Sequence, residues 1–531
     1  MGRYLRAGIR LFPFLLLLVP CISFGERLQP SDLVYQGAFR LPDDFNWGAR
    51  GVSYYPPGNS GAGSLLVTGF ELLFDQNHPG ESCWDPSWNC SAYYGEIAIP
   101  APAIETNWEN LPQATLLGGM VNFDGGLASS VHREYVFVSD MEYVPRRGTQ
   151  TADKVYGSIE FWYAEGAVGE HTFPTIWMAN LNGSGARGMF HVGPETTPYH
   201  GRKMGSYLFT VPQWYADRYL GGRILVTGRS RGTPVGYDPV TTQGGSQGPT
   251  LFAFQALNTD NPTGNLDALP FLYYRVKFPG CAGPNVGDPS QCDYPAFTMC
   301  DSWTGGAFVD NGSRQAILLL GYKGLGTNCY DEPPVECNDP CSDSHGYHCN
   351  PYERQIIFYD VDELGENVSS ATPWTVLPYT IWRPDVFYLQ GDVQGNVCGD
   401  VGGMAVDPAG GRLFMVERGL GGTDNNAAVV HVWTFSSFSC PPCSGGAVSL
   451  SNVRFPSGST CRCEATSIAI NTGVTIPSGA VVEFIASSSI TVKTGSGLAI
   501  PDGATVTFSA PLVTIRAGVT IANGARVHFR Q

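Results

Sequence analysis

Helical periodicity is almost absent from this sequence, and so is any motif that specifies a reaction. No GxSxG elbow or dinucleotide fingerprint occurs in the strand–turn–helix context that gives those motifs their chemistry, and P-loop and HExxH sequences are missing altogether. Positive charge is scarce as well, because 31 Lys and Arg residues stand against 47 Asp and Glu residues, for a formal net charge of −16. This balance argues against binding to nucleic acid or to an anionic membrane.

Long apolar runs are limited to one, at residues 11–22, which follows three arginines and precedes a small-residue site ending at Gly25. The run is too short to span a bilayer comfortably and predicts a secretory signal peptide over residues 1–25. The alternative is a lipoprotein acylated on Cys21, although Pro20 stands where such sites want a small, flexible residue. No later segment is apolar enough to cross a membrane, so we expect a secreted or cell-surface protein. Removal of the three arginines takes its formal charge from −16 to −19.

Fourteen of the fifteen cysteines remain once the signal is removed, and an even number in an exported chain predicts disulfides. The rival interpretation is metal binding by the Cys440/Cys443 and Cys461/Cys463 pairs, but a CxxC followed by CxC lacks the usual spacing of zinc sites. The cysteines expected to form bridges are Cys83, Cys90, Cys281, Cys292, Cys300, Cys329, Cys337, Cys341, Cys349, Cys398, Cys440, Cys443, Cys461 and Cys463.

Short β-branched and aromatic runs alternate with Gly, Pro, Asn and Asp turns over residues 33–435, which is typical of an all-β domain. Within it, a glycine-led strand, a turn, a second strand and a third strand recur as a unit. The units begin at Gly51, Gly125, Gly188, Gly305 and Gly402. A four-stranded unit repeated around an axis is a propeller blade, so we predict a five-bladed β-propeller over residues 26–435. Six blades are the alternative if residues 206–212 form a blade of their own.

The last unit shows only three strands, whereas the start of the mature chain supplies an orphan strand at residues 33–41. Pairing this strand with residues 429–435 closes the ring and hides two exposed edges. This closure is the strongest argument for a ring over an open sandwich.

Residues 436–446 are rich in Ser, Cys, Pro and Gly and are predicted to form a linker. Beyond them, turn glycines recur at positions 458, 479, 503 and 524, which are 21, 24 and 21 residues apart. The Ile- and Val-rich strands between these turns predict a β-solenoid over residues 447–531, whose coils stack to bury those side chains. The whole chain thus resembles secreted bacterial β-propeller proteins with a short solenoid tail. The resemblance is architectural and implies no catalytic residues.

In a propeller, the loops that join second to third strands and those that join consecutive blades open on the same face, and the cysteine-rich loops of this sequence fall there.

Strand ends bring charged residues to that face as well. The candidate catalytic carboxylates are Asp301, Asp400, Glu71, Glu142 and Glu417, and the candidate ligand-binding residues are Arg50, Trp47, Trp303, Arg229, Arg231, Lys323 and Arg418. Facing carboxylates can act as acid and base, or acid and nucleophile, on a glycosidic bond, while arginine and tryptophan hold sugar groups. The architecture looks like that of five-bladed glycosidases and sugar-binding propellers, but none of their catalytic motifs matches residue by residue. The alternative is that these charges simply pair with each other.

Acidic residues also crowd the loop that carries four cysteines. They are Asp331, Glu332, Glu336, Asp339 and Asp343, and oxygen ligands of this kind suit Ca²⁺. No EF-hand-like spacing appears, so solvated acids are the favoured interpretation, with calcium as the alternative and His345 with His348 as a weaker zinc alternative. His200 and Tyr207 are a thin candidate pair for the base and acid of a uronate lyase.

These features lead to three hypotheses about function. The favoured one is binding of a glycan or another surface ligand at the cysteine-rich face, with the solenoid as anchor or spacer. The second is a polysaccharide hydrolase or lyase that uses the same face. The third is a surface-layer or filament component that assembles through its last coil, near residues 519–529, because an uncapped solenoid end invites partners. Whether the protein is an enzyme stays open at this stage.

Overall fold

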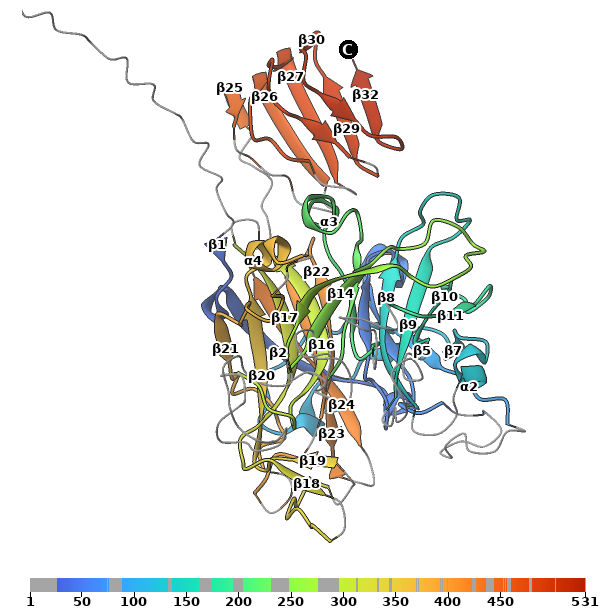
Figure 1. The fold of residues 1–531 in the computed structure, drawn as a ribbon. Helices are drawn as coiled ribbons and strands as arrows, with labels where there is room; N and C mark the ends of the chain where they lie inside the picture. The colour runs from blue at the N-terminus through green and yellow to red at the C-terminus, as the bar shows by residue number, and fades with distance from the viewer. Residues whose placement is uncertain are drawn as a thin grey trace, which may run out of the picture.

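The computed structural model describes residues 26–73, 75, 88–131, 136–161, 174–193, 204–230, 248–275, 296–311, 314–331, 334–342, 346–368, 370, 372–391, 393, 395–398, 400–422, 426–435, 444–451, 453, 455, 460–476, 480–501 and 503–530. Over these residues the chain is almost entirely β, with a propeller body and a separate stack of parallel strands (Figure 1). No helix among them is both long and apolar enough to span a bilayer. The predicted signal peptide lies outside the described residues.

Five sheets surround a common axis and form the blades of the propeller. The innermost strands of blades 1 to 5 are β3 (Val52–Tyr55), β8 (Val136–Val144), β12 (Leu208–Thr210), β16 (Ser302–Asp310) and β22 (Val401–Asp407). Each innermost strand contacts the next, and β22 contacts β3, so the ring is complete. The five-bladed prediction is confirmed.

The other strands of each blade follow outwards in antiparallel order. The second strands are β4 (Ser64–Thr68), β9 (Lys154–Phe161), β13 (Leu225–Thr227), β17 (Arg314–Gly324) and β23 (Arg412–Leu420). The third strands are β5 (Tyr93–Ala98), β10 (Ile176–Asn180), β14 (Thr250–Phe254), β20 (Tyr352–Tyr359) and β24 (Ala427–Phe435). The outer strands are β6 (Thr115–Leu116), β11 (Arg187–Phe190), β15 (Ala268–Tyr273), β21 (Thr380–Trp382) and β2 (Leu33–Arg40). Two short strands add to this set, since β7 (Val121–Asn122) pairs with β5 and β1 (Glu26–Arg27) pairs with β17.

The ring closes by a strand from the start of the described chain. β2 pairs antiparallel with β24, in a register that runs from Leu33 opposite Phe435 to Arg40 opposite Val429. β24 therefore has neighbours on both sides, and its edge is hidden. The predicted closure is confirmed.

Blades 2 and 3 are divided differently from the sequence prediction. The prediction that Gly125 begins a strand is wrong, because it lies in a turn before the short helix α2 (Leu127–Val131), where the Asp124 carboxylate accepts the backbone N–H groups of Gly126 and Ala128. The innermost strand of blade 2 is instead β8. Residues 187–190 do not open blade 3 but form β11, the outer strand of blade 2. Residues 206–212 contain β12, the innermost strand of blade 3, so they do not form a sixth blade.

The antiparallel order gives the propeller two distinct faces. The starts of the innermost strands, the ends of the second strands and the starts of the third strands share one face, which we call the mouth face. The hairpin of β18 (Cys329–Asp331) and β19 (Gly346–His348) follows the end of β17 on this face. The opposite face carries tight turns and the short helices α1 (Gly58–Gly61), α3 (Gln213–Tyr219) and α4 (Val361–Glu366). In Figure 1 the solenoid lies on the side of α3 and α4, away from the β18–β19 hairpin.

The C-terminal strands form a small parallel β-solenoid. Its main sheet contains β25 (Ser444–Leu450), β26 (Thr460–Ile470), β27 (Val481–Val492), β29 (Thr505–Ser509), β30 (Leu512–Ile515) and β32 (Arg526–Arg530), and a second pair joins β28 (Ala499–Ile500) to β31 (Thr520–Ile521). The rings of Phe484 and Phe508 stack inside, with centroids 5.4 Å apart, and those of Phe508 and Phe529 follow at 5.6 Å. Because each coil buries its Ile, Val and Phe side chains only against the next coil, the stack is the unit that is stable.

Candidate functional site

Five charged side chains form a continuous series of ion pairs across the mouth face. The Arg418 guanidinium lies 2.5 Å from Glu71 Oε2 and 3.0 Å from Asp400 Oδ2. Glu71 Oε2 also lies 3.7 Å from Arg50 Nη1, and Arg50 Nη2 lies 3.7 Å from Glu160 Oε2. These residues come from the ends of strands in blades 5, 1 and 2. We call this set of five residues the mouth network.

The mouth network also reaches blade 3, through Ser230 just beyond β13. The Ser230 hydroxyl donates a hydrogen bond to Glu160 Oε1. The backbone carbonyl of Ser230 accepts the backbone N–H of Trp303 in blade 4, at 2.7 Å. All five blades are thus linked by polar contacts at the end of the channel. The sequence analysis named four of the five charged residues, Glu71, Asp400, Arg50 and Arg418, but did not identify Glu160 or Ser230.

Neighbouring charges shift the pKa values of Glu71 and Arg50 in the mouth network. Burial raises the pKa of Glu71, but the guanidinium groups of Arg418 and Arg50 outweigh it and hold this pKa below its usual range. Burial lowers the pKa of Arg50, whereas the surrounding carboxylates, led by Asp400, bring it above its ordinary value. Glu71 is therefore an anion at neutral pH, so it can accept hydrogen bonds but has no proton to give.

Trp47 is held in an exposed position beside this network. Its side chain is 39% exposed, and its backbone takes the left-handed conformation with φ of 59°, as does that of Ala49 with φ of 58°. The loop is tied down because the Trp47 carbonyl accepts the Glu71 N–H at 2.8 Å and the Gly48 carbonyl accepts Arg418 Nε–H at 2.6 Å. Left-handed backbone at non-glycine residues costs roughly 1 kcal/mol or more each and is concentrated at ligand-binding sites.

Asp301 and Lys323 lie at the mouth face but do not join the network. Asp301 is fully buried and accepts the Thr298 N–H at 2.9 Å, the Thr298 hydroxyl at 2.6 Å and the Gly324 N–H at 3.0 Å. Lys323 Nζ lies 3.3 Å from its carboxylate. Burial raises the pKa of Asp301 although Lys323 opposes the shift. This geometry fastens the start of β16 to the end of β17.

Glu142 lies inside the channel, together with Asp140, which the sequence analysis missed. Glu142 Oε2 accepts the Ser53 hydroxyl at 2.7 Å, and Oε1 accepts the Thr210 hydroxyl at 2.7 Å and the Thr210 N–H at 3.1 Å. Burial raises the pKa of Glu142 to about 7. The carboxylate thus clamps blades 1, 2 and 3 together at their innermost strands.

Asp140 forms a second clamp two residues earlier on the same strand. Its Oδ2 accepts the Leu208 N–H at 2.8 Å, while Oδ1 accepts the N–H groups of Met141 at 2.9 Å and Val52 at 3.3 Å. Burial raises the pKa of this carboxyl well above its ordinary value. Because its acceptor sites are directed at backbone N–H groups from three blades, Asp140 holds the innermost strands in place.

Glu417 is fully buried within blade 5 and does not reach the mouth. It accepts the N–H groups of Tyr388 at 2.9 Å and Leu389 at 2.8 Å, and its Oε2 lies 2.8 Å from His431 Nε2. His431 Nδ1 in turn lies 2.9 Å from the Tyr35 hydroxyl of β2. Burial raises the pKa of Glu417, but the hydrogen bond and charge of His431 bring it below its usual range. This chain of contacts fastens the closing strand to blade 5.

The other candidate residues are mostly interior. Trp303 is fully buried between blades 3 and 4, and Arg229 is fully buried with its guanidinium 4.7 Å from the centre of the Tyr273 ring. Tyr207 is also buried and donates its hydroxyl to the Thr250 carbonyl, and burial raises its pKa. Two residues, Arg231 and His200, lie outside the described residues.

The described disulfides of the propeller gather on the mouth face, and further bonded cysteines lie in the solenoid. Bridges join Cys300 to Cys349, Cys329 to Cys337 and Cys341 to Cys398, and Cys90, Cys461 and Cys463 are also disulfide-bonded. The zinc alternative therefore does not hold for Cys461 and Cys463, because their sulfur atoms are bonded in disulfides. The remaining predicted cysteines lie outside the described residues and are Cys83, Cys281, Cys292, Cys440 and Cys443.

Two acids of the four-cysteine loop, Asp331 and Asp339, accept hydrogen bonds from protein donors. Asp331 accepts the Cys337 N–H at 2.8 Å, and Asp339 accepts the Tyr352 hydroxyl at 2.7 Å beside His348 Nδ1 at 2.8 Å. Within the described parts of the chain, no three His, Cys, Asp or Glu side chains are grouped so that they could hold a metal ion. Three other residues named for metal binding, Glu332, Asp343 and His345, lie outside the described residues.

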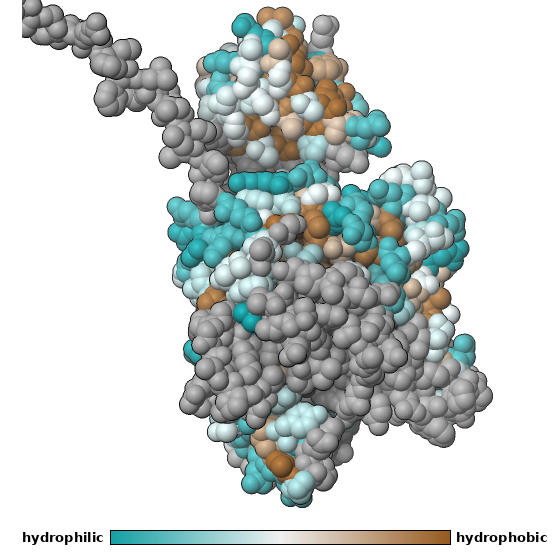
Figure 2. All heavy atoms as spheres, in the orientation of Figure 1, coloured by the Kyte–Doolittle hydropathy of each residue, from teal (hydrophilic) through white to brown (hydrophobic). Residues whose placement is uncertain are grey.

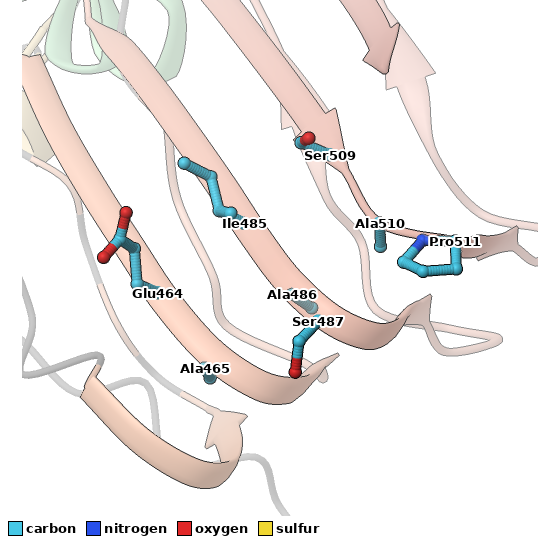
Figure 3. Close-up of a pocket in the computed structure, with 8 residues that line it drawn as sticks. All are labelled: Glu464, Ala465, Ile485, Ala486, Ser487, Ser509, Ala510 and Pro511. Atoms are coloured by element: carbon cyan, nitrogen blue, oxygen red, sulfur yellow. The ribbon is translucent and has the colours of Figure 1, made fainter. Parts of the chain in front are cut away.

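Two hollows lined by described residues lie away from the mouth network. The first, of about 420 Å³, runs across three solenoid coils and is lined by Glu464, Ala465, Ile485, Ala486, Ser487, Ser509, Ala510 and Pro511 (Figure 3). The second, of about 300 Å³, lies beside blade 3 and is lined by Gly221, Arg223, Gln255, Leu257, Asn265, Leu266 and Asp267. Neither contains a residue that the sequence analysis proposed.

No protein-family description matches the chain, and no curated protein matches it in sequence. Two solved structures are similar at 10% sequence identity, each covering 76% of this chain and 98% of its own. One is a protein of unknown function from Dyadobacter fermentans, with a TM-score of 0.31, and the other is a member of the DUF4221 family from Bacteroides vulgatus, with a TM-score of 0.30. Neither likeness is close enough to bear on function.

Proposed function

We propose that the protein is an extracytoplasmic binding protein that recognises a glycan or another cell-surface ligand at the mouth face of its propeller. In this proposal the solenoid serves as a spacer or anchor. The disulfides of the described chain support folding outside the cytoplasm, because thiols are kept reduced inside most cells. The signal peptide over residues 1–25 stays a prediction.

The observation that carries the proposal is the exposed Trp47 side chain beside the mouth network. An indole can cover the apolar face of a sugar ring, and partly exposed charged groups can hydrogen-bond its hydroxyls. The carboxylates of Glu71 and Asp400 are 20% and 34% exposed, and the Arg50 side chain is 14% exposed. The left-handed backbone that presents Trp47 has no evident value for the stability of the fold, whereas it does serve binding.

The arrangement favours binding over turnover. Three of the five candidate carboxylates, Asp301, Glu142 and Glu417, are engaged in holding strands together. The other two, Glu71 and Asp400, share the Arg418 guanidinium, and the arginines hold the pKa of Glu71 below its usual range. A glycosidase needs one carboxyl group that keeps its proton near neutral pH, and Glu71 does not meet this requirement.

The test is a panel of soluble polysaccharides presented to the full chain, with and without calcium. We expect saturable binding to at least one member, without release of new chain ends, and a Trp47→Ala variant should bind roughly tenfold more weakly because the stacking surface is lost. The matched control is Phe529→Ala, which removes an exposed aromatic side chain on the solenoid and should leave binding unchanged.

Two results would contradict the proposal. Equal binding by the parent and Trp47→Ala would show that the indole is not part of the site. Release of reducing or unsaturated ends by the parent, and its loss in Glu71→Gln or Asp400→Asn, would favour the hydrolase or lyase hypothesis instead.

Self-assembly through the solenoid is a second candidate, favoured by the apolar surface of its last coils. Leu512 is 60% exposed, Ile521 is 52% exposed and Phe529 is 58% exposed, and apolar surface is visible on the solenoid in Figure 2. If these residues join copies of the chain, the double variant Leu512→Glu/Ile521→Glu should convert oligomers to monomers in light scattering. A parent that is monomeric at high concentration would exclude this role.

A further inference from the structure

Arg229 differs from the other cations at the mouth face of the described chain. Arg418, Arg50 and Lys323 each lie within 4.0 Å of at least one carboxylate oxygen. Arg229 lies just beyond the end of β13, next to Ser230, and forms no such pair among the described residues. The backbone N–H of Arg229 donates a hydrogen bond to the Thr250 hydroxyl at 3.1 Å, whereas its guanidinium donates none to the described residues.

The Arg229 guanidinium is buried without acceptors. The side chain is 0% exposed, and Nε, Nη1 and Nη2 all lack a hydrogen-bond acceptor among the described residues. Among the described residues, the guanidinium lies over the face of the Tyr273 ring, 4.7 Å from the ring centre. Stacking of this kind orients the planar group but leaves its N–H donors free. A buried guanidinium whose donors are unused is costly, and a ligand that completes its hydrogen bonds is one explanation for keeping such a group.

The neighbours of Arg229 narrow the chemistry of that ligand. The guanidinium lies over Tyr273, the last residue of β15, which pairs with Thr250 at the start of β14, so it lies at the mouth-face end of blade 3. The adjacent Ser230 connects this position to Glu160 of the mouth network. A planar fork of N–H donors matches two oxygens of one anionic group, as in a carboxylate or a sulfate. A neutral hydroxyl would satisfy one donor and leave the charge without a counter-ion.

We propose that Arg229 is an anion-binding residue and that the ligand of the mouth face is an acidic polysaccharide, whose carboxylate or sulfate groups it receives. This inference rests on the proposed function and narrows it from glycans in general to acidic ones. It assigns the role to a residue whose side chain forms no hydrogen bond within the described part of the chain.

The test compares the parent with Arg229→Met, which keeps much of the side-chain volume but removes the charge. The probes are polygalacturonate for carboxylate groups, dextran sulfate for sulfate groups and neutral dextran as the uncharged reference. We expect the parent to prefer one of the two acidic polymers, and Arg229→Met to bind it roughly ten- to a hundredfold more weakly, because hydrogen bonds to a charged group are lost. The matched control is Arg187→Met. Arg187 is an exposed arginine on β11 that donates a hydrogen bond to Asn261, and this variant should bind as the parent does.

The melting temperature without ligand is a second, independent measurement. An arginine retained for binding should be dispensable for folding, so Arg229→Met should melt at or above the temperature of the parent. A fall as large as that of Arg418→Met would overturn the inference, since it would mean that the charge is already balanced within the protein. Equal affinity of the parent and Arg229→Met for both acidic polymers would overturn it as well.

The outcomes separate this inference from the proposed function. If the parent binds neutral polysaccharides through Trp47 but has no preference for acidic ones, the proposed function stands and the role of Arg229 falls. If the parent binds no polysaccharide of either kind, both fall.

Discussion

The mouth and the interior of the channel hold carboxylates that differ in their partners. At the mouth, Glu71 lies between two guanidinium groups, and its pKa is held below the usual range in spite of burial. Inside the channel, Glu142 meets only neutral hydroxyl and N–H donors, and burial raises its pKa to about 7. Both residues follow the same sequence pattern, a glutamate near the end of a strand. The difference teaches that the partner, and not the position in the strand, decides whether the group is charged.

The two regions therefore differ in what they stabilise. The interior carboxyl groups of Asp140 and Glu142 act as acceptors that join blades, whereas the carboxylates of the mouth neutralise arginines and remain partly open to solvent. We expect substitutions in the interior to affect folding and substitutions at the mouth to affect both folding and binding. Four predictions test this distinction, beginning with the largest effect.

Asp140→Ala should lower the free energy of unfolding by about 4 kcal/mol. The substitution leaves buried N–H groups of Leu208 and Met141 without their acceptor, and each such group costs about 1–3 kcal/mol. The measurement is urea unfolding followed by intrinsic fluorescence. A loss below about 1 kcal/mol would mean that the clamp is redundant.

Arg418→Met should lower the free energy of unfolding by about 3 kcal/mol, because it leaves Glu71 and Asp400 facing each other without a counter-charge. This value is at the low end for a buried pair since both carboxylates are partly exposed. The triple variant that adds Glu71→Gln and Asp400→Asn should recover much of the loss. If the triple variant is no more stable than Arg418→Met, the effect of Arg418 comes from its contact with Gly48 and not from charge.

The contribution of Glu142 to stability should depend on pH with the sign opposite to that of a salt-bridged acid. Its pKa is raised from 4.5 to about 7 in the folded protein, so the stabilisation is complete below pH 4.5 and is lost as the pH rises through 7. We expect a loss of about 2 kcal/mol between pH 5 and pH 8, allowing for partial exposure. The difference between the parent and Glu142→Gln, measured across this range, isolates the effect. A parallel pH dependence in both proteins would assign it to other groups.

Trp47→Gly should have the smallest effect on stability. Glycine adopts a φ of 59° without penalty, and the indole is partly exposed, so the free energy of unfolding should stay within about 0.5–1 kcal/mol of the parent. Binding at the mouth should nevertheless weaken as it does in Trp47→Ala. A variant that loses stability but keeps its ligand would place Trp47 with the interior clamps and remove the contrast between the two regions.

The fold could be predicted from the sequence because its repeats are local. Turn glycines and alternating strands mark the blades, and the orphan strand at the start has an evident partner in the incomplete last blade. The prediction failed at Gly125, where a glycine-led run forms a turn closed by the Asp124 carboxylate. The strand propensity of the residues did not distinguish this capped turn from a strand, because both segments begin with glycine and small apolar residues.

The candidate site was harder to predict because its partners are distant in sequence. Strand direction placed Glu71, Asp400 and Arg418 on one face, but Glu142 and Glu417, which were expected there too, lie in the interior. The burial of Glu142 depends on Ser53 and Thr210, which lie in other blades. No local pattern reports such contacts. Asp140 had a usable signal, because it lies two residues before Glu142 and so shares its face of the strand.

The pairing of β2 with β24, which closes the ring, also sets an order of events during synthesis. β2 leaves the ribosome before the other strands of the five blades, yet its partner β24 is made only after almost the whole propeller. Each blade can form its own hairpins as it emerges, but β2 must wait with an unsatisfied edge until the end. A nascent chain interrupted before β24 thus leaves β2 without its partner, and the last blade works as a checkpoint that only a full-length propeller can pass.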